Sequence, residues 1–479
     1  MSEQIPYKAT KLVSTIGPAT ESEEQLEKLI LGGMNVARFN AKHVDPAWHQ
    51  ERIQRVRNVA DRLGQPIGVL LDLQGPEIRL DLPEGLDGFD AKEGDVVTFT
   101  SDLSLGGTHV IYVPQEVIEA EAEGNRILID DGAGEFFVVA KNGNSLETQV
   151  QDDLTVKKRK TVNTPGVMIN MPSLIQADLG YLDMVMSTPV DFIALSFVRN
   201  KEDIRILKEE MANRGISAAV VAKIENQSAL DNLEEIIAAS EAVMVARGDL
   251  GVEVPYEELT RWQKEIITKS REYARPVITA TQMLKSMVDS PMPTRAEVSD
   301  ISHAVYDGTD AVMLSEETTI GKYPVKTVKT QAKIVMYAEK YATTPAISEL
   351  NLTLRTSVME AAVLLLRELQ SRPTDIQINK TIVLTATGST ARYLAKYRDK
   401  KPIYALTNNP ETYRQLALAY GVTPYLIEFT DESLSNPNSI MDICKEKGIV
   451  SKGEIALIVH GTKWREAGMT NSLRVLEVE

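Results

Sequence analysis

Residues 218–251, AAVVAKIENQSALDNLEEIIAASEAVMVARGDLG, contain the pattern that decides the fold. An apolar run at 218–226 is followed by an amphipathic segment at 227–240 and a second apolar run at 242–251. Short continuous apolar runs are typical of strands that are buried on both faces of a parallel sheet. The stretch therefore predicts one strand–helix–strand unit in which each strand ends in polar residues.

The same unit repeats outward from this stretch in both directions. Predicted strands lie at 11–18, 35–40, 66–75, 191–198, 218–226, 242–251, 276–283 and 310–318. Amphipathic segments separate them, and a final one covers 324–342. Eight β/α units, interrupted once, match a TIM (β/α)8 barrel built from residues 1–79 and 161–343.

The interruption and the end of the chain have different patterns. Residues 80–160 hold short β-type runs between Gly, Asp and Asn clusters, with 17 acidic and 7 basic side chains. This composition predicts an inserted β domain that carries much of the negative charge. Residues 344–479 alternate again, with predicted strands at 381–387, 402–407, 423–429 and 454–461, and predict a C-terminal α/β three-layer domain.

The composition excludes several classes of protein. The chain has 479 residues, a formal net charge of −16 and one cysteine, Cys444, which rules out a disulfide framework. The negative charge argues against a nucleic-acid or membrane-surface partner. No secretory signal and no run of eighteen apolar residues is visible, so we expect a cytoplasmic protein.

Polar residues at the strand ends are the candidate functional residues, because TIM barrels carry their active sites there. Five of the eight predicted strands end in charged side chains, and both signs occur. Salt bridges around a rim would give the same pattern, but the mixture favours a site for a metal and an anionic substrate. The strand ends hold Ser14, Thr15, Arg38, Asn40, Asp72, Gln74, Ser196, Lys223, Glu225, Arg247, Asp249, Thr279, Thr281, Ser315 and Glu317.

The residue types indicate phosphoryl transfer. Glu225 and Asp249 end adjacent predicted strands, which lie about 4.8 Å apart in a sheet. Two carboxylates at that spacing suit a divalent cation, although an acid/base pair is an alternative. Lys223 shares a strand face with Glu225, and Arg38 and Arg79 offer guanidinium groups suited to phosphate. A metal, a lysine and arginines around one anion are the parts of a phosphoryl-transfer site, but the P-loop motif is absent.

The segments that carry these residues resemble pyruvate kinase over essentially the whole chain. They are STIGPAT (14–20), GMNVARFN (33–40), LDLQGPEIR (71–79), VNTPGV (162–167), ALSFVR (194–199), AKIEN (222–226), MVARGDLGVE (244–253), TATQML (279–284), PTRAEVSD (293–300) and LSEET (314–318). The resemblance implies a glycolytic enzyme that transfers the phosphoryl group of phosphoenolpyruvate to ADP, giving pyruvate and ATP. It also implies Mg²⁺ or Mn²⁺ as cofactor and a homotetramer. It further implies that the insertion is a β-barrel lid domain and that the C-terminal α/β three-layer domain has an effector or regulatory role.

The same resemblance implies roles for individual residues. The catalytic residues would be Lys223, Thr281 and Arg38, and the metal ligands Glu225 and Asp249. The substrate would contact Arg38, Lys223, Arg247, Gly248, Asp249, Thr281 and Ser315. The nucleotide would contact Pro18, Arg38, Asn40, His43, Arg79 and Lys160.

The monovalent-cation site departs from the family pattern. Residues 38–44 read RFNAKHV, and Lys42 occupies the place of a serine that helps to bind potassium. The site would comprise Asn40, Lys42, Asp72 and Leu73. We expect the Lys42 ammonium to replace K⁺ and to pair with Glu77 or Asp72. The alternative is that Lys42 points into solvent and K⁺ still binds, since potassium-independent relatives tend to carry lysine where this chain has Glu77.

The C-terminal domain carries a candidate anion loop. Hydroxyls and a glycine lie between a predicted strand and a helix, as in an effector loop for a phosphorylated ligand, although a simple helix cap is an alternative. No further phosphohistidine-type domain is expected after the last residue. The effector loop would comprise Thr385, Thr387, Gly388, Ser389, Thr390, Trp464 and Arg465.

Two other functions are compatible with such a barrel. One is a metal-dependent lyase acting on pyruvate-like enolates, which would not need the lid or Arg79. The other is a degenerate barrel retained as a metabolite sensor. The sensor predicts loss of the catalytic set, whereas Lys223, Glu225, Asp249 and Thr281 are all present.

Overall fold

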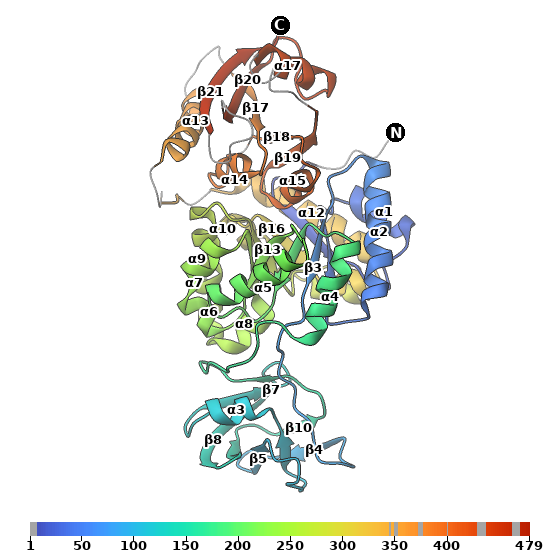
Figure 1. Cartoon of the computed structure of the whole chain (residues 1–479), viewed down its shortest axis with the longest axis vertical. Helices are drawn as coiled ribbons and strands as arrows, with labels where there is room; N and C mark the ends of the chain where they lie inside the picture. Colours follow the sequence, from blue (N-terminus) through green and yellow to red (C-terminus); the bar gives the residue numbers. More distant parts are fainter. Residues whose placement is uncertain are drawn as a thin grey trace.

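A closed eight-stranded parallel barrel forms the centre of the molecule (Figure 1). The computed structural model describes residues 7–343, 346–348, 353–371, 377–399, 401–428, 437–461 and 470–479. Neighbouring strands follow the chain order, and pairing of the first with the last closes the ring. The strands are β1 (Lys11–Thr15), β2 (Val36–Asn40), β3 (Gly68–Asp72), β12 (Phe192–Leu195), β13 (Ala219–Ile224), β14 (Ala242–Ala246), β15 (Val277–Ala280) and β16 (Ala311–Leu314).

Helices surround the barrel and cover its outer apolar face. Local sequence signals fix the ends of these helices. Asp45 caps helix α2 (Pro46–Leu63), and Gly64 ends it at φ 62°. Thr294 and Glu297 form a capping box at the start of helix α10 (Arg295–Asp307). The longer helices are α1 (Glu23–Leu31), α2 (Pro46–Leu63), α4 (Gln176–Ser187), α5 (Lys201–Asn213), α9 (Leu259–Glu272), α10 (Arg295–Asp307) and α12 (Pro324–Tyr341). The shorter ones are α6 (Gln227–Asp231), α7 (Leu233–Ala239), α8 (Arg247–Glu253) and α11 (Glu316–Thr319).

The inserted domain lies at one end of the molecule and is built mainly of strands (Figure 1). Expected as a small β barrel, it has six strands in one sheet, in the order β11-β7-β8-β9-β5-β6, and two in a second sheet. Its apolar core is separate from that of the barrel. Its elements are β4 (Gly88–Ala91), β5 (Val96–Thr100), β6 (Val110–Tyr112), α3 (Gln115–Ala120), β7 (Arg126–Ile129), β8 (Gly134–Asn142), β9 (Ser145–Val150), β10 (Leu154–Lys157) and β11 (Val162–Asn163).

The C-terminal domain is a five-stranded sheet with helices, at the opposite end of the barrel from the lid (Figure 1). Four of its strands were expected, and a fifth, β21, adds an antiparallel edge. Its described elements are α13 (Leu354–Ser371), β17 (Ile378–Leu384), α14 (Ser389–Ala395), β18 (Ile403–Thr407), α15 (Pro410–Gln415), β19 (Val422–Leu426), α17 (Pro437–Glu446), β20 (Ile455–Gly461) and β21 (Thr470–Glu477).

Buried ion pairs join the C-terminal domain to the N-terminal ends of the barrel strands. Arg398 pairs with Asp310, just before β16, at 2.6 Å, and Arg414 pairs with Asp191, just before β12, at 2.7 Å. Leu418 packs into the apolar centre of the barrel. This domain therefore covers the bottom of the barrel and leaves the opposite mouth to the lid. Within the described ranges, no helix is long and apolar enough to cross a membrane.

Candidate active site at the lid end of the barrel

A buried ion cluster at the barrel mouth joins side chains of β2, β3 and β13 with Thr15 of β1 and Ser196 after β12. The Arg38 guanidinium lies 2.6 Å from Asp72 Oδ2 and donates to Thr15 Oγ1 at 2.9 Å. On the other side, Lys223 Nζ lies 3.7 Å from Asp72 Oδ1 and 3.1 Å from Glu225 Oε2. It also donates to Ser196 Oγ at 2.6 Å. The strand-end residues thus form one network of alternating charge, as a charged active site requires.

Lys223 is the centre of this network and stays protonated. Burial lowers the pKa of its ammonium, but the carboxylates of Asp72, Glu225 and Asp249 outweigh burial and raise it overall. A buried lysine with this environment keeps its positive charge at any working pH. It is suited to neutralise negative charge that develops on a substrate.

Glu225 is buried and Asp249 is half-buried. Burial and the neighbouring charge of Asp249 raise the pKa of Glu225 to about 7, and Lys223 opposes this rise. Burial also raises the pKa of Asp249. Phe197 N donates to Glu225 Oε1, whereas Glu225 Oε2 is buried without a hydrogen bond in the described structure.

This donor set fits a divalent cation. Hard cations take oxygen ligands, and a nearby cation would favour the charged form of both carboxylates. In the part of the chain that the structure describes, no group of three or more His, Cys, Asp or Glu side chains is arranged to hold a metal. Two protein carboxylates leave coordination positions for substrate and water, as is usual for Mg²⁺.

Thr281 has a strained backbone directly after β15. Its φ is 69°, which is a genuine outlier for a β-branched residue. Arg247 holds it there by donating to Thr281 O at 2.6 Å and to Ala280 O at 3.0 Å, and Asp300 fixes Arg247 at 2.6 Å. The Thr281 hydroxyl is buried and without a partner, and a Cβ on Gly248 would lie 3.8 Å from it. The threonine is therefore positioned beside the first turn of α8, with its hydroxyl available.

The Arg247 side chain is engaged by other groups of the protein in this arrangement. Its guanidinium is used by the two carbonyl groups and Asp300. Asp300 was not among the predicted site residues, and it lies on α10, far from Arg247 in sequence. Substrate contact by the backbone amides of Arg247 and Gly248 stays a prediction.

Lys42 pairs with Glu77, one of its two expected partners. Lys42 Nζ lies 2.5 Å from Glu77 Oε1, and Arg79 holds the other Glu77 oxygen at 2.7 Å. Asp72, the other expected partner, is used by Arg38 and Lys223. Lys42 also lowers the pKa of Asp249, so its charge acts on the site. The expected ion pair is confirmed, and replacement of potassium stays a prediction.

The other predicted nucleotide and cation residues lie around the same mouth. Asn40 ends β2 and accepts from Lys42 N at 3.2 Å. His43 and Pro18 are exposed on the loops after β2 and β1. The Leu73 carbonyl accepts from Ser196 Oγ at 2.8 Å. Their contacts with nucleotide or potassium stay predictions.

The last strand closes the site through Glu317. This side chain is buried and accepts from Ser315 N at 2.7 Å and Leu284 N at 3.1 Å. It ties the loop after β16 to the loop after β15, where Thr281 lies. Ser315 is thereby held at the mouth, and its predicted substrate contact stays a prediction.

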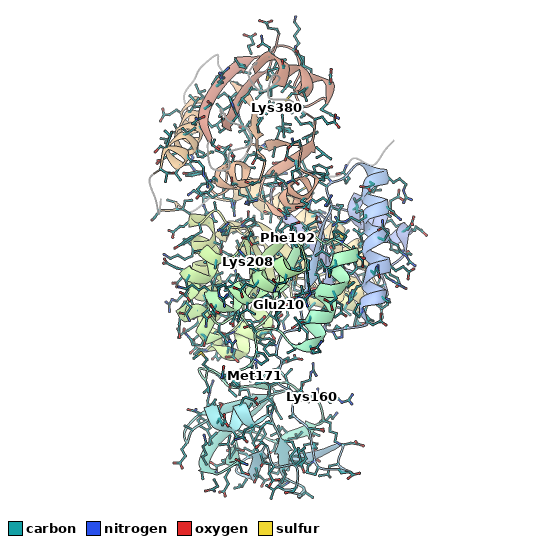
Figure 2. The ribbon with its side chains drawn as sticks, in the orientation of Figure 1. Lys160, Met171, Phe192, Lys208, Glu210 and Lys380 are labelled. Carbon is teal, nitrogen blue, oxygen red and sulfur yellow. The ribbon has the colours of Figure 1, made fainter. Side chains whose placement is uncertain are left out.

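Lys160 lies where the lid meets the barrel (Figure 2). Its ammonium group lies 2.7 Å from Asp130 Oδ1, within the lid. Arg79, at the other lid connection, donates to Arg159 O. The two connections are thus joined to each other, and Lys160 would have to leave Asp130 to reach a nucleotide.

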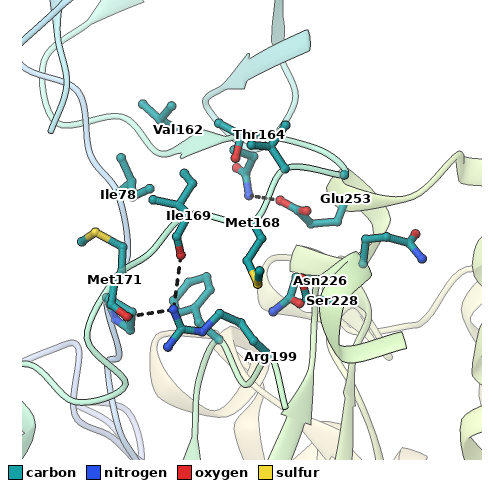
Figure 3. Close-up of a pocket in the computed structure, with 16 residues that line it drawn as sticks. Ile78, Val162, Thr164, Met168, Ile169, Met171, Arg199, Asn226, Ser228 and Glu253 are labelled. Carbon is teal, nitrogen blue, oxygen red and sulfur yellow. Dashed lines mark hydrogen bonds between the residues drawn. The ribbon is translucent and has the colours of Figure 1, made fainter. Parts of the chain in front are cut away.

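A small cavity of about 100 Å³ lies beside the returning lid connection (Figure 3). Residues of the segment 162–171 form one wall, and Ile78, the loop after β12 and residues of α6 and α8 line the rest. Arg199 donates to the carbonyl oxygens of Ile169 and Met171, which fixes the connection to the barrel. Asn163 Nδ2 donates to Glu253 Oε1 at 3.2 Å across the same cavity.

Glu253→Gln should stabilise the protein progressively as pH rises. Burial raises the pKa of Glu253 to about 7. Because folding raises the pKa of this carboxyl group, its neutral form stabilises the folded protein fully below about pH 4.5. This stabilisation is lost as the pH rises through about 7. Glutamine keeps an oxygen that accepts from Asn163 but does not ionise. We therefore expect the free energy of unfolding of Glu253→Gln to exceed that of the wild type by about 1–2 kcal/mol at pH 8. Thermal unfolding of both proteins from pH 5 to pH 8 measures this difference in stability, and Glu257→Gln, at an exposed position, is the control. A difference between Glu253→Gln and wild type that does not increase with pH would contradict the expectation.

Two residues that sequence reasoning missed support the mouth from outside. Asp178, on α4, accepts from Gln74 N at 2.9 Å and from Gly75 N at 3.2 Å, which fixes the loop after β3. Phe197 has φ 56°, and this turn aims its N–H at Glu225. Neither has a local sequence signal, because both act through contacts distant in sequence.

The predicted effector loop joins β17 to α14. Gly388 has φ 76°, Thr387 Oγ1 donates to Ser389 Oγ at 3.3 Å, and Thr390 Oγ1 lies 2.8 Å from Thr470 Oγ1. Thr385 is buried at the end of β17. Trp464 and Arg465 lie outside the described residues, so effector binding stays a prediction.

A lidded parallel barrel whose mouth combines a charged lysine, one buried and one half-buried carboxylate, and arginines defines a phosphoryl-transfer enzyme. Comparison with known proteins identifies the family within this class of enzymes. The family model described as "Pyruvate kinase, barrel domain" matches residues 7–328, and "Pyruvate kinase, alpha/beta domain" matches residues 367–476. The chain belongs to the pyruvate kinase family, and its function is that of a pyruvate kinase.

Individual relatives match almost the whole chain. Pyruvate kinase of Staphylococcus saprophyticus is 41% identical over 475 residues, which cover 97% of this chain and 80% of that protein. Pyruvate kinase of Thermotoga maritima is 36% identical and covers 98% of this chain and 100% of its own. A crystal structure of a pyruvate kinase from Cryptosporidium parvum has a TM-score of 0.90 at 32% identity, covering 98% of this chain and 96% of its own.

Proposed function

We propose that this chain transfers the phosphoryl group of phosphoenolpyruvate to ADP through the ion cluster at the lid end of the barrel. The main support is the position of Lys223, whose buried ammonium is surrounded by Asp72, Glu225 and Asp249. Phosphoryl transfer needs positioning and neutralisation of charge more than covalent participation by the protein. Lys223 supplies a fixed positive charge for the phosphoryl group in flight.

Other residues of the mouth complete the proposed reaction. Glu225 and Asp249 would hold the divalent metal, which would supply positive charge for the oxygen atoms of the substrate and of the enolate. The Thr281 hydroxyl lies free beside Gly248 and assists protonation of the enolate carbon. Arg38 and Arg79 bind phosphate oxygens, and Lys160 joins them when the lid closes and excludes water.

Several finer statements are part of the same proposal. We propose Mg²⁺ or Mn²⁺ as the metal, and domain boundaries after residues 79, 160 and 343. A cytoplasmic homotetramer follows from the family resemblance alone. A phosphorylated effector at residues 385–390 is supported by the hydroxyl-rich turn between β17 and α14.

A coupled assay of the full chain tests the reaction. With phosphoenolpyruvate, ADP and MgCl₂, we expect pyruvate to form, and omission of either substrate should abolish it. Chelation of the metal with EDTA should stop the reaction, and excess Mg²⁺ should restore it. A folded chain that releases no pyruvate under these conditions would contradict the proposal.

A further inference from the structure

A second, strongly basic cavity lies at the other end of the barrel. Its volume is about 310 Å³, and it separates the segment between α9 and β15 from α13 and α14 of the C-terminal domain. In Figure 1, α14 lies on the barrel side of its domain. Four cationic side chains and one carboxylate line it: Arg275, Arg355, Arg392, Lys396 and Glu272.

The acidic groups nearby are engaged with other partners. Glu272 lies 3.4 Å from Lys269 and accepts from Ser348 N at 3.4 Å. Glu241, whose charge also acts on Arg392, lies 2.7 Å from Lys208 and accepts from Val220 N at 3.0 Å. Positive charge in the cavity is therefore not balanced by these carboxylates.

The three arginines have no carboxylate partner among the residues that the structure describes. Arg275 donates to Ala238 O at 3.0 Å, and its Nε is buried without a hydrogen bond. The Arg355 guanidinium lies 4.0 Å from the centre of the Tyr393 ring. Within one protein, unpaired guanidinium groups around a cavity repel one another, and an anion removes that repulsion.

Arg392 shows the effect of this crowding. Burial lowers its pKa to about 10, and Arg275 and Arg355 contribute to the lowering. Its side chain extends under the loop before α14, since a Cβ on Gly388 would lie 2.7 Å from Arg392 Nη1. Arg392 and Lys396 are four residues apart, on one face of α14. That face meets Arg275 of the barrel across the cavity.

We infer that this cavity is a binding site for a small molecule that carries a phosphate group. Guanidinium groups bind phosphate oxygens through charge-assisted hydrogen bonds, and Arg275, Arg355 and Arg392 supply them from both domains. The volume is at the lower end of the range for small-molecule sites. A bound ligand would link the barrel to the C-terminal domain.

This site is separate from the catalytic mouth and does not depend on the proposed reaction. Arg275 precedes β15, at the N-terminal end of that strand, whereas Thr281 follows its C-terminal end. Of the described residues in the predicted effector loop, only Ser389 also lines this cavity, and the arginines that define the cavity lie outside that loop.

Binding of inorganic phosphate to the full chain tests the inference. Calorimetric titration at constant ionic strength, with chloride as the exchanged anion, should show a phosphate site in wild-type protein and in Lys223→Met. Arg392→Gln and Arg355→Gln should each weaken it by about tenfold, because each removes a charge-assisted hydrogen bond. Lys380→Gln, on β17 of the same domain (Figure 2), is the matched control and should leave binding unchanged.

The unfolding temperature of each variant, measured without phosphate, shows whether the substitution has destabilised the protein. Arg355 is outside the barrel and stacks on a tyrosine, so its variant stays informative where Arg392→Gln is unstable. Equal phosphate affinity in the wild type and in a folded arginine variant would overturn the inference. So would wild-type protein that binds no phosphate, or binding that Lys223→Met abolishes.

Discussion

Lys223→Met is expected to lower kcat about a thousandfold, which corresponds to ~4 kcal/mol of transition-state stabilisation. The KM for phosphoenolpyruvate should change much less, because the ammonium counts most when charge moves onto the transferring group. Methionine is close to lysine in length and removes only the charge and its hydrogen bond to Ser196. Steady-state kinetics at saturating Mg²⁺ measures both constants.

The same substitution should also weaken the metal site. Lys223 holds down the pKa of Glu225, which is still about 7 because the side chain is buried. Without the lysine a larger fraction of Glu225 is protonated at neutral pH, so more Mg²⁺ is needed and activity moves to higher pH. Lys208→Met, on α5 outside the barrel, is the control. A folded Lys223→Met enzyme with kcat within tenfold of wild type would exclude this role.

The barrel could be predicted from the sequence because its pattern is local. Each strand is a short apolar run, as in residues 219–224, and each is followed by an amphipathic segment that reveals the helix. Lys223, Glu225 and Asp249 could be identified because the chain places them at strand ends, and a closed barrel brings all strand ends to one mouth. Local periodicity and topology are sufficient for that part of the site.

The supporting contacts could not be predicted because they connect residues distant in sequence. Nothing near Asp178 indicates that it fixes Gly75, and nothing near Asp300 indicates that it directs Arg247 toward the Thr281 carbonyl. The left-handed backbone of Thr281 contradicts local propensity and is maintained by tertiary contacts.

The contacts between the C-terminal domain and the barrel could not be predicted either, because they also join residues distant in sequence. Arg398 and Asp310 are separated by 88 residues and pair in a buried interface at 2.6 Å. A charged residue in a sequence is by default exposed, so neither side chain indicates burial. The basic cavity could not be predicted for this reason, since it combines Arg275 with residues of α13 and α14.

The wild-type enzyme is expected to be active in potassium-free Tris buffer, and KCl should change its rate less than twofold. Lys42→Ser should instead depend on potassium and be activated by about tenfold, which is ~1.4 kcal/mol. The Lys42 ammonium is held at the mouth by Glu77 at 2.5 Å and lowers the pKa of Asp249. A serine removes this charge and leaves oxygen atoms of Asn40, Asp72 and Leu73 that suit a monovalent cation.

Initial rates with added KCl, NaCl or tetramethylammonium chloride separate a specific cation effect from ionic strength. Lys28→Ser, which removes an exposed lysine paired with Glu24 on α1, is the matched control and should behave as wild type. In the wild-type enzyme the Lys42 ammonium is a fixed cation in place of an exchangeable one. The activity of Lys42→Ser should therefore recover with K⁺ and recover less with Na⁺. Strong activation of the wild-type enzyme by potassium would show that Lys42 does not replace the ion.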